Sequence, residues 1–154
     1  MVASFQKALK DYLKTKNFNV KSYFGEFDKP DTAEVLKTFL PCVMVDFVES
    51  VPEGLFREEA TFSLYLVHLA YSKQEETRKG KDYALLDFIK DVKDALHVKS
   101  IEENEPINVT KIKKIFDAAK GQSYMTVYLM SFNVTLIDKN YTNGEVEWRE
   151  TSLS

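Results

Sequence analysis

The chain begins with apolar residues at helical spacing. Between Val2 and Lys16 the apolar positions fall on one side of a helical projection, and lysines with one aspartate fall on the other. The apolar positions are Phe5, Ala8, Leu9, Tyr12 and Leu13. This pattern predicts an amphipathic helix that covers a core.

A second helical pattern occupies the middle of the chain, from Asp82 to Val98. Its apolar positions again share one side. They are Tyr83, Leu86, Ile89, Val92 and Leu96, widened by Leu85, Phe88 and Ala95. The charged stretch before it, Ser72 to Lys81, is expected to be a connection.

Three stretches of the N-terminal half favour strands. Aromatic and β-branched residues from Phe18 to Phe27 suit a first strand. The run from Pro41 to Val48 is apolar on both faces except for Asp46, which suits a central strand, and Ala60 to Ala70 alternates as a third strand does. The segment Glu49 to Glu59 between them contains a proline, a glycine and four glutamates, so we expect a turn or protruding loop there.

Two further strands are predicted near the C-terminus. Ile107 to Asp117 carries several lysines, as an exposed edge strand does. Ser123 to Ile137 is apolar on both faces and much longer than the usual five to six residues, so part of it is expected to leave the body of the domain. The polar stretch from Asp138 onward is expected to be a tail or a short added strand that becomes ordered on contact with a neighbour.

These elements predict an α+β fold with a twisted, mainly antiparallel sheet of about five strands and two helices packed on one face. Residues 1–137 are expected to form a single domain, with residues 138–154 as the C-terminal tail or added strand. A chain of 154 residues, 44% of them hydrophobic, can bury a core of its own.

Charge and hydropathy narrow the classes of partner. The formal net charge is −3, with both signs interspersed, so no basic footprint for sequence-specific nucleic acid is present. Charged residues interrupt every apolar run before it reaches the roughly 18 residues of a membrane span, so no membrane partner is expected. The N-terminus lacks the order of residues typical of a secretory signal, and we expect the protein to stay inside the cell that makes it.

The sequence offers little to a catalytic mechanism. Cys42, the sole cysteine, lies in an apolar run and is expected to be a small buried residue. His68 lies on the apolar side of a strand, as a core or interface histidine does, and His97 ends a helix, where a partly charged ring complements the dipole. Neither is near a nucleophile motif, and no metal-ligand spacing or phosphate-binding loop occurs, so we predict no catalytic residue, cofactor or metal.

Several stretches, taken in order, resemble one known family. The run Leu40 to Phe47, a Pro-containing acidic loop, and Arg57 leading into Phe62 to Val67 resemble the Mu-like tail terminator (tail completion) proteins of contractile-tailed bacteriophages and prophages. After a charged loop, the helix Tyr83 to His97 continues the resemblance. The final strand, Ser123 to Thr135, also fits.

The resemblance covers about Val2 to Ile137 and is a pattern of elements without an invariant signature. The chain departs from the pattern in its stretch 138–154 and in the lysines of Lys111 to Lys114. These departures leave open whether the particle is a phage, a prophage or a tail-derived contractile injection device.

The resemblance implies a non-enzymatic virion structural protein. Its expected form is a homo-oligomeric ring, typically a hexamer, that meets the tail tube and sheath proteins and the head-completion or connector proteins, with DNA passing through its lumen. Its expected location is the host cytoplasm during assembly and then the tail or neck of the virion. The expected contact residues are Glu49, Glu53, Arg57, Glu58, Glu59, Lys111, Lys113, Trp148 and Arg149.

Two alternatives remain beside the ring. One is a small adaptor that binds a partner by strand addition along the Lys111 edge, in a phage neck or an unrelated complex. The other, less favoured, is a small enzyme that uses acidic residues around Asp46. Oligomeric state separates the ring from the adaptor, and dependence on a metal or small substrate would favour the enzyme.

Overall fold

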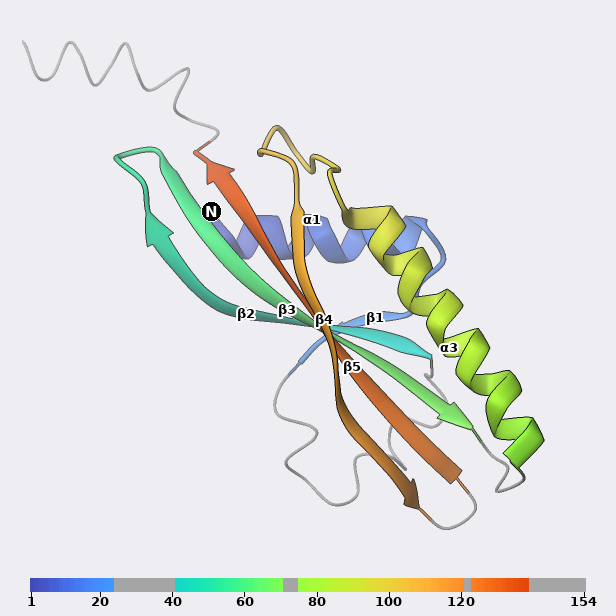
Figure 1. The fold of residues 1–154 in the computed structure, drawn as a ribbon. Coiled ribbons are helices and arrows are strands. Elements are labelled where there is room, and N and C mark those ends of the chain that lie inside the picture. Colours follow the sequence, from blue (N-terminus) through green and yellow to red (C-terminus); the bar gives the residue numbers. More distant parts are fainter. Residues whose placement is uncertain (24–40, 71–74, 121–122, 139–154) are drawn as a thin grey trace, which may run out of the picture.

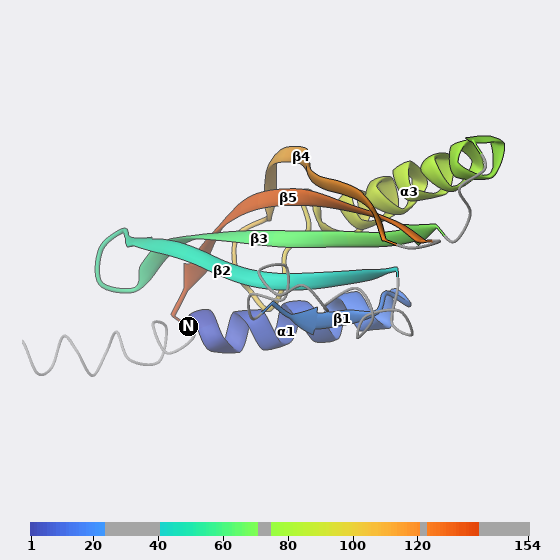
Figure 2. The ribbon, with the colours of Figure 1, turned by 90° about the horizontal axis from the view of Figure 1, so that it is seen from below.

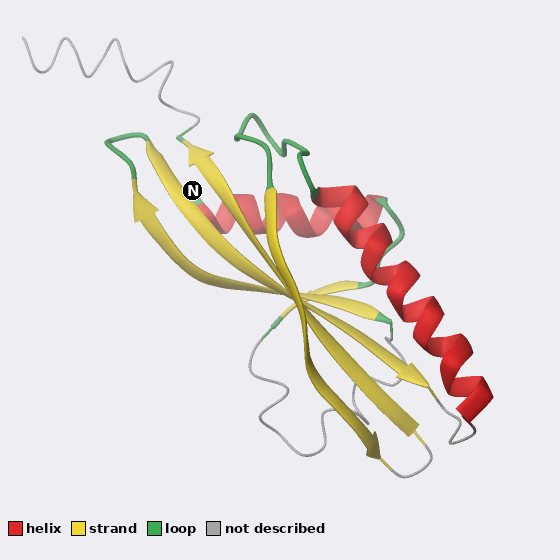
Figure 3. Cartoon of the chain, viewed as in Figure 1, coloured by secondary structure: helices red, strands yellow, loops and turns green. Residues whose placement is uncertain are grey.

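The computed structural model describes residues 1–23, 41–70, 75–120 and 123–138. These residues form an α+β fold with one mixed sheet and two helices (Figure 3). In chain order the elements are α1 (Val2–Thr15), β1 (Val20–Ser22), β2 (Cys42–Pro52), β3 (Arg57–Ala70), α3 (Glu75–Leu96), β4 (Asn108–Lys120) and β5 (Ser123–Ile137).

The sheet has the strand order β1-β2-β3-β5-β4. β1 is parallel to β2, and every other pair of neighbours is antiparallel. α3 carries the chain from β3 to the far edge strand β4, and β5 then returns between them. The strands cross one another when seen along the sheet in Figure 1, as the right-handed twist of β-strands requires.

Both helices lie on one side of the sheet, on what we call the helix face (Figure 1). Phe62 of β3 is fully buried there, and its ring centroid lies 5.3 Å from those of Phe5 in α1 and Phe132 in β5. The hydroxyl of Tyr12 in α1 donates a hydrogen bond to the backbone oxygen of Ala95 in α3 at 2.6 Å. Apolar burial holds this layer together, at about 1.5–3 kcal/mol for each fully buried large side chain.

The other side of the sheet, which we call the opposite face, is divided along its length. One half is an apolar cluster, with Tyr23 and Tyr65 stacked at 4.2 Å beside it. Its buried members are Cys42, Met44, Val67, Met125 and Val127. The other half, toward the turn between β2 and β3, is polar, and Thr61 there donates a hydrogen bond to Asn133 at 3.1 Å.

Most of the predicted elements are confirmed. The α+β class, the mainly antiparallel sheet and the two helices on one face are as expected, and β5 has the predicted bounds. Cys42 is buried, also as expected. The predicted first strand is shorter, at Val20–Ser22, and its end at residues 24–27 lies outside the described residues.

Three expectations about the elements are wrong. The segment Glu49 to Glu59 is not a loop, because β2 continues to Pro52 and β3 begins at Arg57. Glutamates are compatible with an exposed hairpin, and only residues 53–56 form the turn. β5 does not leave the body of the domain, since β3 pairs with it from Tyr124 to Ile137.

The third error concerns α3, which begins at Glu75 within the stretch expected to be a connection. Its first turns lack apolar periodicity, but Glu, Lys and Arg have good helix propensity without packing. The buried stripe of α3 also differs from the expected one: Leu85, Ile89, Val92 and Leu96 are buried, whereas Tyr83 and Leu86 are exposed.

Candidate interaction surface

The hairpin of β2 and β3 ends in a tight turn at one extremity of the molecule (Figures 1 and 2). The backbone N–H of Glu53 donates to the carbonyl of Arg57 at 2.8 Å and closes the turn. Gly54 has φ +94°, a left-handed conformation that side chains disfavour, although a Cβ there would meet no atom within 4 Å. Backbone conformation, and not lack of space, therefore explains the glycine.

Three large apolar side chains are exposed along this hairpin, and we call them the hairpin strip: Val48, Val51 and Leu55. Their exposed fractions are 52%, 57% and 73%. Val48 sits at a β-bulge, where the register shifts between Phe47 and Glu49. Large apolar residues exposed along a strand and its turn mark a place that a partner can cover.

Among the described residues, no strand covers the outer edge of β2 beside the hairpin strip. β1 pairs with β2 only as far as Val45, whose carbonyl accepts the N–H of Tyr23 at 2.9 Å. Beyond that point, among the described residues, β2 pairs with β3 alone. The stretch from Phe47 to Pro52 therefore offers backbone hydrogen-bonding groups to a further strand.

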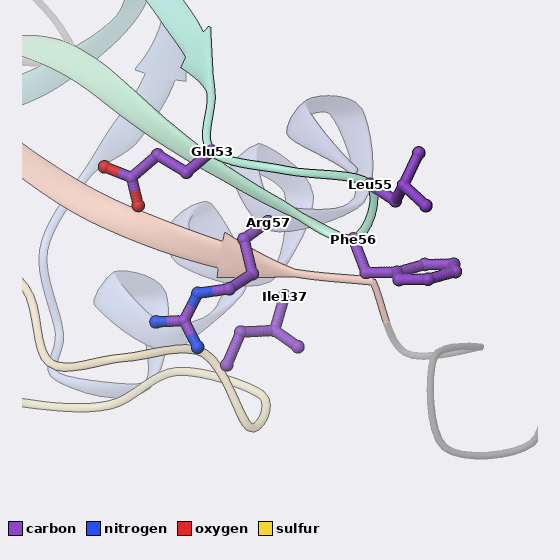
Figure 4. A pocket seen from close by; sticks show the side chains of 5 residues that line it. All are labelled: Glu53, Leu55, Phe56, Arg57 and Ile137. Carbon is purple, nitrogen blue, oxygen red and sulfur yellow. The ribbon is translucent and has the colours of Figure 1, made fainter. Parts of the chain in front are cut away.

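A small hollow lies beside the turn. It is lined by Glu53, Leu55, Phe56, Arg57 and Ile137. Figure 4 shows Leu55 and Phe56 projecting to one side of the turn, while Glu53 and Arg57 extend to the other. Its volume of about 240 Å³ is below the 300–1,000 Å³ of ordinary ligand pockets, so it suits a single side chain better than a substrate.

The loop from Ser100 to Pro106, between α3 and β4, supports this end of the sheet. Asn104 is buried, and its amide donates to the carbonyl of Ile101 at 2.9 Å while its Oδ1 accepts the N–H of Ile137 at 2.9 Å. Glu105 donates its backbone N–H to Thr135 at 3.1 Å and pairs its carboxylate with the Arg57 guanidinium. The loop thereby completes the edge of β5 ahead of the first residue of β4.

Sequence reasoning missed the roles of Asn104 and Glu105 in this loop. The sequence from Ser100 to Pro106 indicates only an acidic connection. An Asn among glutamates carries no spacing signal, because its hydrogen bond to β5 depends on a contact far along the chain. Only the sheet topology brings the two segments together.

β4 forms the other edge of the sheet, as its lysines led us to expect. Lys111 and Lys113 are exposed on it, as are Ile112 and Ile115, at 38% and 42%. At its start, the N–H of Val109 donates to Nδ1 of His97 at 3.1 Å. From Thr110 to Ile115, β4 pairs with β5 alone among the described residues.

The expected contact residues fall into two groups. Glu49, Glu53, Arg57, Glu58 and Glu59 gather on the hairpin, although three of the glutamates are strand residues and not loop residues. Lys111 and Lys113 lie on the opposite edge, with β3 and β5 between the two groups. Trp148 and Arg149 lie outside the described residues.

The two histidines serve structural contacts. His68 is half-buried on β3 and lies across from Thr126 of β5. His97 directly follows the end of α3. Its Nδ1 accepts a hydrogen bond from the backbone N–H of Val109, which ties the end of α3 to β4.

Among the described residues, few ionisable groups have a shifted pKa. Burial raises the pKa of the Asp46 carboxyl above its ordinary value. A hydrogen bond with Lys90 lowers the pKa of Asp94, but this pair lies on the exposed side of α3. Within the described ranges no group of three or more His, Cys, Asp or Glu side chains is placed to hold a metal ion.

Comparisons with known proteins gave no match that indicates a function. No family model matches the sequence, and no curated protein matches it significantly. In the part of the chain that the structure describes, no helix combines the length and hydropathy of a membrane-crossing segment.

Proposed function

We propose that this chain is a structural ring subunit at the end of a contractile phage tail or a related phage-tail-like particle. In this role the ring, typically a hexamer, ends polymerisation of the tail tube and sheath and joins the tail to head-completion proteins. The chain acts by assembly, without a catalytic step. The hairpin strip is the observation that carries the proposal.

Solvent exposure of the hairpin strip is costly for an isolated chain. Fully burying a valine or leucine side chain stabilises a protein by about 1.5–3 kcal/mol, and the exposed side chains of the strip lack most of this stabilisation. Val51 and Leu55 are more than half exposed. Val51 lies on β2, whose outer edge is open there among the described residues, and Leu55 lies in the turn that follows. A partner that covers them recovers this free energy, which favours association.

The positions of the two open strand edges favour a ring over a two-fold dimer. Phe47 to Pro52 on β2 and Thr110 to Ile115 on β4 lie at opposite edges of the sheet. Contacts between unlike surfaces repeat from copy to copy and close into a ring when the rotation allows. The resemblance to tail terminator proteins indicates the particle in which such a ring would act. An α+β sheet with both helices on one face is the fold that this resemblance implies.

The length of tail tubes assembled in vitro tests this function. Purified tail tube protein from the same particle is polymerised with and without the chain, and tube lengths are measured by electron microscopy. We expect short tubes that each end in a ring. Unchanged tube lengths, with no chain bound at the ends, would overturn the proposal.

A matched pair of variants makes the tube experiment specific to the hairpin strip. Leu55→Asp places a charge in the strip and should abolish the shortening. Val98→Asp is the control, because Val98 is similarly exposed, at 67%, but lies after α3. If neither variant shortens the tubes, the effect of Leu55→Asp is not specific to the hairpin strip.

A second candidate function is an adaptor that binds a peptide by strand addition. The position of β4 at the sheet edge favours it, since such an edge can accept an extended segment. An adaptor remains monomeric or dimeric with and without the tube protein, whereas the ring subunit forms a closed ring. Solution mass therefore separates the two functions.

A further inference from the structure

The two open edges of the sheet differ in charge. The β2 edge carries Glu49 and Glu53, both exposed, and the β4 edge carries exposed Lys111 and Lys113. The apolar residues beside them are also matched, with Val48 and Val51 on β2 and Ile112 and Ile115 on β4. Each edge thus combines exposed apolar groups with charges of one sign.

The charges of the two edges also lie on the same face of the sheet. Glu49 pairs with Thr61, which pairs with Asn133 on β5. Lys111 pairs with Ser131, two positions from Asn133 along β5. Because paired residues and alternate residues of a strand share a face, Glu49 and Lys111 both belong to the opposite face.

Like edges repel one another. Two β4 edges would bring lysines against lysines, and two β2 edges would bring glutamates against glutamates. Lysines on an edge strand guard against pairing between identical edges, but they do not oppose an acidic edge. The charge pattern therefore selects contact between unlike edges.

We propose that β4 of one copy adds to the outer edge of β2 in the next copy, between Phe47 and Pro52. The sheets of neighbouring copies then continue one another around the ring, with Lys111 and Lys113 facing Glu49 and Glu53 of the neighbour. This inference rests on the proposed ring and names the segments that join its subunits. Backbone hydrogen bonds hold the contact, and the charges select its partner.

Two charge-reversed variants test the pairing. Glu49→Lys with Glu53→Lys makes both edges basic, and Lys111→Glu with Lys113→Glu makes both acidic. Each variant alone should lose the ring and run at the 17.8 kDa of the single chain. A 1:1 mixture should restore the ring. In an alternating ring the reversed β4 edge of one variant meets the reversed β2 edge of the other, the two unreversed edges also meet, and both contacts join opposite charges.

Light scattering is the measurement, under the conditions in which the wild-type chain forms a ring, alone or on the tail tube. Asp87→Lys with Asp91→Lys, on the exposed side of α3, is the matched control and should assemble normally. Rings from either reversed variant alone would overturn the edge pairing and leave the ring proposal standing. A 1:1 mixture in which the folded variants stay monomeric would also overturn the edge pairing alone. A wild-type chain that forms no ring would overturn both proposals.

Disulfide cross-linking keeps the test decisive if a reversed variant fails to fold. Val51→Cys is combined with Lys111→Cys or with Lys113→Cys, all on the opposite face, and the chain is oxidised. At least one combination should give a ladder of covalent oligomers, and Val51→Cys with Lys7→Cys should not. Rings that yield no ladder with either combination would overturn the pairing.

Discussion

The helix face and the hairpin strip contain the same kinds of side chain in opposite environments. Phe62 and Leu64 on the helix face have no exposed surface, whereas Val51 and Leu55 are exposed to 57% and 73%. Phe62 and Leu64 lie on β3, in the same β2–β3 hairpin that carries the strip. The difference separates two uses of apolar surface: the helix face stabilises the single chain, and the hairpin strip stabilises an assembly.

The largest effect is expected on the helix face. Phe62→Ala removes a ring that contacts Phe5, Phe47 and Phe132, and we expect the free energy of unfolding to fall by about 3–5 kcal/mol. Chemical denaturation monitored by circular dichroism measures this change. A loss below about 1 kcal/mol would show that the helix face is not the main source of stability.

An intermediate effect is expected at the loop that supports the hairpin end. Asn104→Ala leaves the N–H of Ile137 without its acceptor, and we expect a loss of about 1–3 kcal/mol. Hydrogen exchange should accelerate at Ile137, and Asn108→Ala, at an exposed position, should leave it unchanged. Unaltered exchange at Ile137 in Asn104→Ala would contradict the role assigned to this side chain.

A smaller effect, dependent on pH, is expected at Asp46, where the buried part of β2 meets its exposed part. Burial raises the pKa of this carboxyl, so folding favours the protonated form. Its contribution to stability is complete below the ordinary pKa of 3.8 and is lost as pH rises through the folded-state value.

Asp46→Asn should therefore be modestly more stable than the wild-type chain at neutral pH, and the difference should disappear at acidic pH below 3.8. Thermal melts across this range measure it. A variant that is less stable at neutral pH would show that the charged carboxylate makes a favourable contact, contrary to the desolvation described above.

The smallest effect on stability is expected in the hairpin strip. It distinguishes the strip most clearly from the helix face. Val51→Ser and Leu55→Ser should each change the free energy of unfolding by less than about 0.5 kcal/mol. Both should nevertheless weaken assembly in light scattering. A large loss of stability in the monomer would mean that the strip belongs to the core of the single chain.

Periodicity was sufficient to predict the elements that pack on the core. Phe5, Leu9 and Leu13 recur at helical spacing and are buried, and the bounds of β5 follow from alternation that is apolar on both faces. Periodicity failed where charged residues replace the apolar pattern. The sequence of the first turns of α3 is rich in charges, and the outer part of the β2–β3 hairpin carries glutamates at exposed or half-buried positions.

The candidate surface was predictable only in part. The glutamates and lysines were identified as contact residues, but no local pattern indicates that β3 and β5 separate them or that β5 lies between β3 and β4. Strand order depends on long-range pairing, such as that of Phe62 with Phe132. The hydrogen bond between Asn104 and Ile137 of β5 also depends on residues far apart in the chain, so no local pattern in the sequence indicates it.

The solution mass of the wild-type chain is the most direct test of assembly through the hairpin strip. Light scattering across a range of concentrations, with and without purified tail tube protein, measures it. The account predicts a closed ring, of six times the 17.8 kDa chain mass if it is the expected hexamer, formed alone or on the tube, and its loss in Leu55→Asp. A chain that stays monomeric under all these conditions and does not bind the tube would contradict it.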